Sequence, residues 1–495
     1  MRSRFTLAGL VAVAGIGGIL LAVSLTRPPA PAAAPAPPGR LELLGSDPLL
    51  NRGMNAALAV HGDYAYVGSR TDGTHPNAGV LVVDVSDPSA PRVVNQIGRP
   101  NEANPGESSR ELRVWPEQNL LIVMNFQCDE VGHLCLGAAA GSLDPTFRFY
   151  DIAGDHASDP ELVATYRVSR NPHEFFLWRD PRRAGRALLY ITTPFVEGAD
   201  IDKDHPHLLV TDISRAREGR FRELASWSPE RESRWDEAGL HSLSVSRDGR
   251  RAYLADLEGG FAMADTSDLA NGVPRPRITQ LTASERTVHH ESPGAHSAVA
   301  LPGQPYALIT DEVYGAAFGA GPLIGFNVLK GCPWGWARTI DVSDPASPQI
   351  AAEYKVLPWN DPERCSEVTP LQQNGASFSS HNPTLAGRVG LITWHSAGLQ
   401  AVSLGDPEGP SQLADFKPQP LPAVAAEDPA LSSGSEKVVM WSYPIVKDGL
   451  IYVVDIRNGL YVLRYSGPLE DDVRCEAFDE GNSNLERRVP GCGGR

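Results

Sequence analysis

A short histidine-centred segment recurs four times along the chain and constrains the fold more than any other feature. The histidines are His173, His241, His296 and His381, and each opens a run with strand character, such as FFLW after the first. A polar or glycine-containing break then leads to a second apolar strand, such as ALLYIT or VGLIT. Four histidines thus occupy one register in successive repeats, and repeats arranged around an axis would bring their imidazoles together.

The strands around these histidines follow a four-strand pattern that recurs seven times. The clearest copy runs from Ala56 to Ile97, and its DVSDPSAP stretch is a turn in which Asp folds back on the backbone and Pro fixes φ. The seventh repeat supplies three strands, whereas an unmatched strand, RLELLG from Arg40, precedes the first repeat. We therefore predict an all-β fold: a seven-bladed β-propeller of four-stranded blades, with the ring closed by the N-terminal strand completing the last blade.

Two of the repeats resemble a known family. The segments LVVDVSDPSAP and TIDVSDPASP are similar to those of LVIVD-repeat proteins, and the other five repeats match in outline. The resemblance implies a β-propeller, of a kind often exported by bacteria. It implies no single reaction, because one fold hosts many functions.

The chain divides into four expected parts. Residues 1–27 form a signal peptide or a membrane anchor, because two arginines precede an uncharged apolar stretch long enough to span a bilayer. Residues 28–40 are a Pro/Ala linker, residues 41–466 the propeller, and residues 467–495 a polar C-terminal tail. Both readings of the N-terminus place the body outside the cytoplasm, in the periplasm or at the cell surface, and tether it to the membrane if the segment is not cleaved.

Cysteine content and charge agree with that compartment. The chain has six cysteines without a CxxC motif, so disulfides are favoured over a thiolate metal site. The pairs suggested by position are Cys128 with Cys135, Cys332 with Cys365, and Cys475 with Cys492. The formal net charge of -16 argues against a nucleic-acid partner.

The first strand of each propeller blade faces the central channel. Aligning the seven first strands places polar residues at one position: Asn55, Arg110, His173, His241, His296, His381 and Tyr443. Because imidazole is the commonest protein ligand for transition metals, we predict that the four histidines bind Fe, Cu or Zn. The alternative is that they hydrogen-bond around a water-filled channel and bind nothing.

Metal-bound histidines need partners on their second ring nitrogens. The candidates are carboxylates near the same rim: Glu174, Glu291, Asp256, Asp311 and Glu312. His395 ends the second strand of the sixth repeat and is a candidate fifth ligand or base. Asn55, Arg110 and Tyr443 face the open side of the site, near the expected substrate.

Two functions from different classes remain open. The first is an exported metalloenzyme, and its arrangement resembles in outline the carotenoid oxygenases and the selenium-binding propellers. Neither family's motifs occur here, and the analogy implies an oxidoreductase. The second is a non-catalytic cell-envelope module that binds a protein, a glycan or a small ligand.

Overall fold

The computed structural model describes a single unit of the chain, within residues 37–495. The described residues are 37–99, 107–127, 145–193, 206–230, 239–257, 259–288, 294–312, 333–361, 364–365, 377–428, 431–432 and 434–492. The expected signal or anchor segment, residues 1–27, lies outside them. Within these ranges, no helix has the length and apolar character needed to cross a bilayer.

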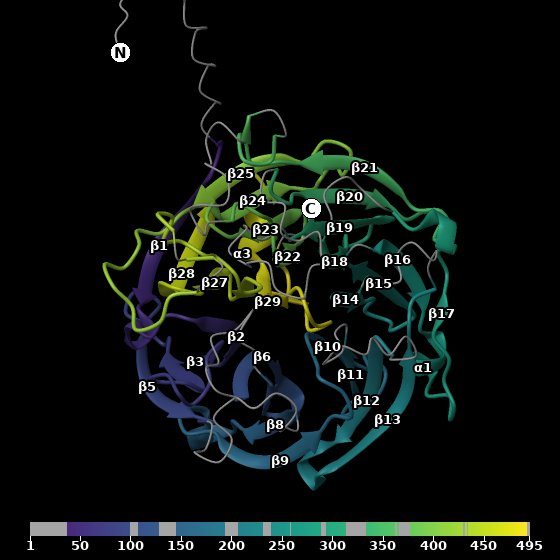
Figure 1. Ribbon diagram of the computed structural model, residues 1–495, viewed down its shortest axis with the longest axis horizontal. Coiled ribbons are helices and arrows are strands. Elements are labelled where there is room, and N and C mark those ends of the chain that lie inside the picture. The colour runs from purple at the N-terminus through teal and green to yellow at the C-terminus, as the bar shows by residue number, and fades with distance from the viewer. Residues whose placement is uncertain are drawn as a thin grey trace, which may run out of the picture. The chain divides into compact units, whose positions relative to one another are not determined.

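Four sheets are antiparallel and have four strands each, with neighbours in chain order (Figure 1). The first contains β10 (Phe175–Arg179), β11 (Ala187–Thr192), β12 (Leu208–Arg215) and β13 (Arg220–Trp227). The second contains β14 (Ser242–Val245), β15 (Arg251–Asp256), β16 (Gly260–Asp265) and β17 (Thr279–Gln280). The third contains β18 (Ala295–Ala300), β19 (Tyr306–Asp311), β20 (Ala337–Asp341) and β21 (Gln349–Tyr354). The fourth contains β22 (Pro383–Ala386), β23 (Val389–Trp394), β24 (Gly398–Ser403) and β25 (Ser411–Phe416).

Two sheets are larger. The eight-stranded sheet contains β2 (Asn55–His61), β3 (Tyr64–Ser69), β4 (Val80–Asp84), β5 (Arg92–Ile97), β6 (Glu107–Trp115), β7 (Leu120–Gln127), β8 (Thr146–Asp151) and β9 (Glu161–Arg167). The six-stranded sheet contains β1 (Arg40–Asp47), β26 (Ile445–Lys447), β27 (Leu450–Asp455), β28 (Gly459–Ser466), β29 (Glu476–Glu480) and β30 (Arg487–Arg488). Two short helices, α1 (Ser267–Asn271) and α3 (Glu470–Arg474), complete the described secondary structure apart from 3-10 turns.

The prediction of seven separate four-stranded blades is wrong. In the described part of the chain, five blades are separate sheets, and the sixth sheet is a continuous one of eight strands. Its two halves are joined because β3 pairs with β6 at Ser69 and Ser109. The last blade has six strands rather than four, because β29 adds to β26. The repeat pattern in the sequence predicts how many strands the chain forms. Where one sheet ends is determined by hydrogen bonds between neighbouring repeats, which the pattern does not show.

The N-terminal strand does join the last blade. β1 pairs antiparallel with β28, from Arg40 opposite Ser466 to Asp47 opposite Leu460. The two ends of the propeller region therefore meet in one sheet, with β1 as its outermost strand. The all-β propeller and the strand that closes it are as expected from the repeats.

Burial falls from the inner to the outer strands of a sheet. The inner strands β11 and β23 are buried along their whole length, whereas the outermost strands β5 and β13 contain exposed residues. An inner strand is covered on both faces by neighbouring sheets, so it is apolar throughout, while an outer strand keeps the polar alternation of a half-exposed edge. The core between sheets includes Leu81, Ile122 and Phe147.

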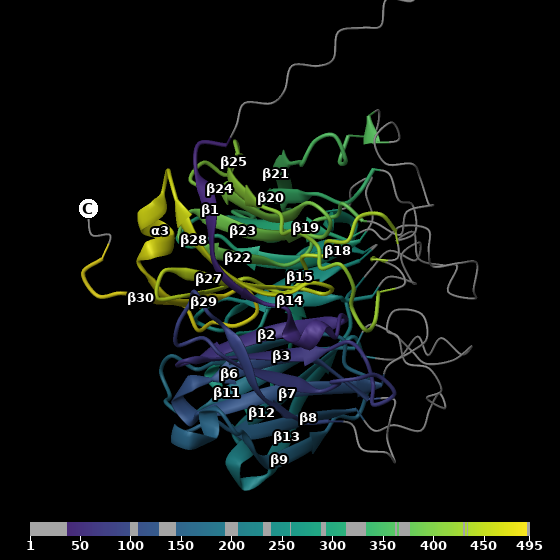
Figure 2. The same ribbon diagram turned by 90° about the vertical axis from the view of Figure 1, so that its left-hand side faces the viewer.

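The C-terminal segment, residues 470–492, folds back onto the sheets (Figures 1 and 2). β29 pairs with the inner strand β26, and the chain then crosses to β10, where the Leu177 amide donates to the Asn482 carbonyl at 3.1 Å. A disulfide between Cys475 and Cys492 closes the segment, which confirms that predicted pair. Cys365 is also disulfide-bonded, while Cys128, Cys135 and Cys332 lie outside the described residues.

Candidate metal centre

Equivalent backbone bonds hold three of the four histidines. The amides of His173, His241 and His381 each donate to a carbonyl at the end of the adjacent second strand, at 2.8, 2.9 and 2.9 Å. His296 lies instead at an irregularity in β18, where the register with β19 shifts between Ala295 and Ser297. Bulges of this kind turn a side chain to a new direction and are common beside functional sites.

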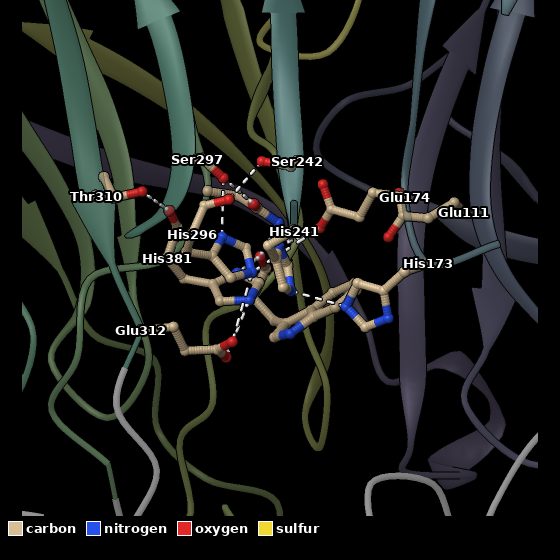
Figure 3. A network of polar contacts seen from close by, with 12 residues as sticks. Glu111, His173, Glu174, His241, Ser242, His296, Ser297, Thr310, Glu312 and His381 are labelled. Atoms are coloured by element: carbon tan, nitrogen blue, oxygen red, sulfur yellow. Dashed lines mark hydrogen bonds and ion pairs between the residues drawn. The ribbon is translucent and has the colours of Figure 1, made fainter. Parts of the chain in front are cut away.

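Hydroxyl groups from neighbouring sheets donate hydrogen bonds to the backbone carbonyl oxygens of three of the histidines. The Thr192 hydroxyl donates to the His241 carbonyl at 2.8 Å, and the Thr310 hydroxyl donates to the His381 carbonyl. The Ser242 hydroxyl donates to the His296 carbonyl (Figure 3). Because each donor belongs to the preceding sheet, the histidine positions depend on how adjacent sheets pack.

The carboxylate of Glu312 faces three imidazoles. Its Oε1 lies 3.2 Å from Nε2 of His381 and 3.3 Å from Nε2 of His395, and its Oε2 lies 3.5 Å from Nε2 of His296. The four side chains are buried, with at most 5% of the Glu312 side chain exposed. Beyond these contacts, Nε2 of His296 and of His381 has no hydrogen-bond partner among the described residues.

The other nitrogen of each of these three rings has a partner in the fold. Nδ1 of His381 lies 2.8 Å from the carbonyl oxygen of Trp441, and Nδ1 of His395 lies 2.9 Å from Oγ of Ser377. Nδ1 of His296 lies 2.8 Å from Oγ of its neighbour, Ser297. This is the second set of contacts that metal-bound imidazoles need, since a partner at Nδ1 orients the ring and leaves Nε2 to act as the ligand.

A second carboxylate, Glu174, approaches the cluster from the side opposite Glu312 (Figure 3). Its Oε1 lies 3.9 Å from Nε2 of His296 and 4.0 Å from Nδ1 of His241. Nε2 of His241 lies 2.7 Å from Nε2 of His173, whose ring also contacts the Arg110 guanidinium, with Nη1 at 3.2 Å from Nδ1. His173 is half-buried, whereas His241 is buried.

A layer of polar residues lies directly behind the histidines. The Tyr443 hydroxyl donates to Oε2 of Glu174 at 3.3 Å and lies 3.1 Å from Oγ of Ser297, which in turn donates to Oδ1 of Asn382. Glu174, Ser297 and Asn382 each directly follow one of the histidines in sequence, so this layer is built from the neighbours of the ligand residues. Among the described residues, Tyr443 contacts the cluster through Glu174 and Ser297.

Electrostatics distinguish the two carboxylates. Burial, together with the nearby charge of Glu111, raises the pKa of Glu174 well above its usual value. Burial alone would also raise the pKa of Glu312, but His381 and His296 hold it well below. The surroundings therefore favour the charged form of Glu312 and the neutral form of Glu174.

Burial also favours the neutral form of His241, His296 and His381. It lowers the pKa of His241 to about 3, and the Glu312 charge only partly opposes this. It lowers the pKa of His381 to about 4, and it moves the pKa of His296 well below the usual value, helped by the neighbouring His241 and His381. Neutral imidazole is the form that binds metals, so the rings are ready as ligands at physiological pH.

The remaining predicted residues lie away from the cluster or support it indirectly. Asn55 donates to the Ile456 carbonyl at 3.0 Å and accepts from Arg52 at 2.7 Å. Asp311 accepts from Arg338, and Asp256 lines a small cavity between other strands. Glu291 lies outside the described residues.

Sequence reasoning placed Glu312 among partners of the rings, not among direct ligands. Glu312 follows the last residue of β19, and His395 follows the last residue of β23, so the two share one register in adjacent sheets. This shared register is the feature of the sequence from which Glu312 and His395 could be recognised as ligands. It places a carboxylate and an imidazole beside the histidines of the first strands.

Two overlapping groups of side chains could each hold a metal ion. Glu174, His241 and His296 form one, and His296, Glu312 and His381 form the other, each with ligand atoms within 4.8 Å of one another. Four ligands at about 2.1 Å from a metal are separated by about 3.4 Å from one another. The separations around Glu312, 3.2 to 3.5 Å, match that spacing.

This chain is similar to one family model and to several solved structures. A model of the LVIVD repeat matches residues 52–97. No curated protein matches the chain. One similar solved structure is the Cps50 (Swd1) β-propeller domain of Myceliophteria thermophila, which is 10% identical, covers 86% of this chain and 99% of its own, and has a TM-score of 0.46. A second is Sqt1 of Saccharomyces cerevisiae, which is 9% identical, covers 86% of this chain and 100% of its own, and has a TM-score of 0.47. A third is the periplasmic gluconolactonase PpgL of Pseudomonas aeruginosa, which is 12% identical, covers 87% of this chain and 96% of its own, and has a TM-score of 0.44. The sheets and the matched segment together identify this chain as a β-propeller protein that carries an LVIVD repeat.

Proposed function

We propose that this protein binds a first-row transition metal ion through Glu312 and the Nε2 atoms of His296, His381 and His395. The observation that carries the proposal is the convergence of three imidazole nitrogens on one carboxylate, at 3.2 to 3.5 Å. Imidazole nitrogens with a single carboxylate suit Zn, Fe and Cu.

The charge balance of the site favours a bound cation. Glu312 is buried, and burial lowers the pKa of His296 beside it, which disfavours a positive charge on that ring. A buried charge without a counter-ion is costly, because its hydration is lost and nothing replaces it. A divalent metal between the carboxylate and the rings supplies that counter-charge and occupies the ring nitrogens.

The identity of the metal separates the two classes of function. Iron or copper at this site would support an oxidoreductase, because both metals change oxidation state. Zinc has no redox chemistry and would favour a structural site or a binding module for a protein, glycan or small ligand. The location outside the cytoplasm is part of the proposal, and the disulfide between Cys475 and Cys492 supports it.

The test is elemental analysis of the purified full-length protein. We expect at least one iron, copper or zinc ion per chain, retained through gel filtration. The variant Glu312→Gln keeps the shape of the side chain but removes its charge, so it should weaken metal binding more than tenfold.

The matched control is His156→Ala. His156 lies in the turn between β8 and β9, with its side chain 46% exposed, and should not affect metal content. The proposal would be contradicted if the wild-type protein bound none of these metals. It would also be contradicted if Glu312→Gln had the same metal content as the wild type.

A further inference from the structure

We infer that the centre holds two metal ions, bridged by the carboxylate of Glu312. The inference rests on the proposed function and extends it: with both ions bound, His296 passes from the first ion to a second one, which Glu174 and His241 complete. Figure 3 shows Glu312 on one side of the histidines and Glu174 on the other.

The two oxygens of Glu312 face different rings. Oε1 lies 3.2 Å from Nε2 of His381 and 3.3 Å from Nε2 of His395, while Oε2 lies 3.5 Å from Nε2 of His296. One oxygen therefore belongs to the pair His381 and His395, and the other to His296. A carboxylate that presents its two oxygens to separate ligand sets is arranged to bridge two ions.

The second position is completed by Glu174 and His241. Oε1 of Glu174 lies 3.9 Å from Nε2 of His296 and 4.0 Å from Nδ1 of His241. The three residues Glu174, His296 and His241 are only 2%, 0% and 4% exposed, and among the described residues none of the three atoms has a hydrogen-bond partner. Buried polar atoms without partners are rare in proteins, so their grouping at one point indicates a ligand that satisfies all three.

The ligand count fits two ions and exceeds what one can use. His381, His395 and Oε1 of Glu312 supply three ligands to one ion, and His296, His241, Glu174 and Oε2 of Glu312 supply four to the other. The nitrogen of His296 can bind only one ion, because its second nitrogen already contacts Ser297. The distances from Glu174 are about 0.5 Å longer than ligands of one metal require, so Glu174 moves inward on binding.

His173 has a supporting role in this arrangement. Its Nε2 lies 2.7 Å from Nε2 of His241, which leaves Nδ1 of His241 directed at Glu174. His173 thus orients a ligand through that ligand's second nitrogen.

The experiment is a cobalt titration of the full-length, chelator-treated protein, with bound cobalt counted after gel filtration. We expect two Co²⁺ per chain in the wild type and in the His156→Ala control, and one in a Glu174→Gln His241→Asn double variant. One Co²⁺ in the wild type overturns the second position and leaves the proposed function intact, whereas none overturns both. Two bound Co²⁺ per chain in the double variant would show that Glu174 and His241 do not hold the second ion, and would overturn the second position.

Electron paramagnetic resonance of the cobalt-loaded wild type tests the same point without a variant that must fold. Two ions joined by a carboxylate lie about 3.5–4 Å apart. Their spins then couple, and the signal per cobalt falls with the second equivalent. An undiminished signal at two equivalents overturns the bridged pair.

Discussion

Substitution of Gly481 by alanine should detach the C-terminal segment from the propeller sheets. At Gly481 the chain runs so close to Pro383 that an added Cβ would overlap the Pro383 carbonyl oxygen and lie 2.8 Å from the ring of Tyr443. The nearest atoms belong to backbone and to a buried ring, so neither can move aside easily. The segment itself must shift.

The cost follows from the hydrogen bonds that fix this segment. The Gly481 amide donates to the Thr384 hydroxyl at 2.9 Å, and two main-chain bonds join Asn482 and Asn484 to Leu177. The Asn484 side chain makes three more bonds, to main-chain atoms of residues 179 and 247. Loss of two to four of these six bonds, at about 1 kcal/mol each, lowers the free energy of unfolding by about 2–4 kcal/mol.

The assay is guanidinium unfolding of the oxidised protein followed by tryptophan fluorescence. Gly405→Ala is the matched control, because a Cβ there meets only side-chain atoms at 3.7 Å and beyond. We expect that control to change stability by less than about 1 kcal/mol, since the pocket has room and alanine restricts the unfolded chain. If Gly481→Ala unfolds at the same denaturant concentration as Gly405→Ala, the reasoning about this close approach is refuted.

Two further predictions concern the same parts of the molecule. The pKa of His241 is lowered to about 3 and that of His381 to about 4, so below pH 6.5 the unfolded state binds protons that the folded state does not. The metal-free protein should therefore lose stability as the pH falls from about 6.5 to 4. Urea unfolding at several pH values checks this, and a His241→Asn variant with an unchanged pH slope would contradict it. A Cys475→Ser Cys492→Ser variant lacks the disulfide that joins residues 17 apart and should be about 3 kcal/mol less stable in thermal or chemical unfolding, and an unchanged midpoint in that variant would argue against it.

The sequence predicted the histidine register because a repeat preserves position. His241, His296 and His381 come from three successive sheets, and the structure brings their rings to centroid distances of 4.0 and 3.9 Å. His173 shares the register, and its Nε2 lies 2.7 Å from Nε2 of His241. Tyr443 is expected at the same position as the histidines but lies behind them. Side chains alternate along a strand, so a shift of one residue moves a side chain to the other face.

Sheet boundaries could not be predicted in the same way. The eight-stranded sheet depends on one pairing, Ser69 with Ser109, and neither residue carries a pattern that distinguishes it from other strand ends. The sequence predicts a polar tail at residues 467–495, because the segments that form β29 and β30 are short and rich in charge. Their pairing depends on the free inner edge of β26, which exists only once the last blade has formed.

The position of the C-terminal segment bears directly on the candidate centre. Gly481 lies against Tyr443, whose hydroxyl donates to Glu174 at 3.3 Å, and Glu174 in turn faces His241 and His296. The chain of contacts runs from the disulfide-closed segment to the proposed second metal position without passing through Glu312. A disturbance of the segment should therefore weaken the second ion before the first. Gly481→Ala, already expected to detach the segment, would then show less than two bound Co²⁺ per chain while the ion held by His381 and His395 remains.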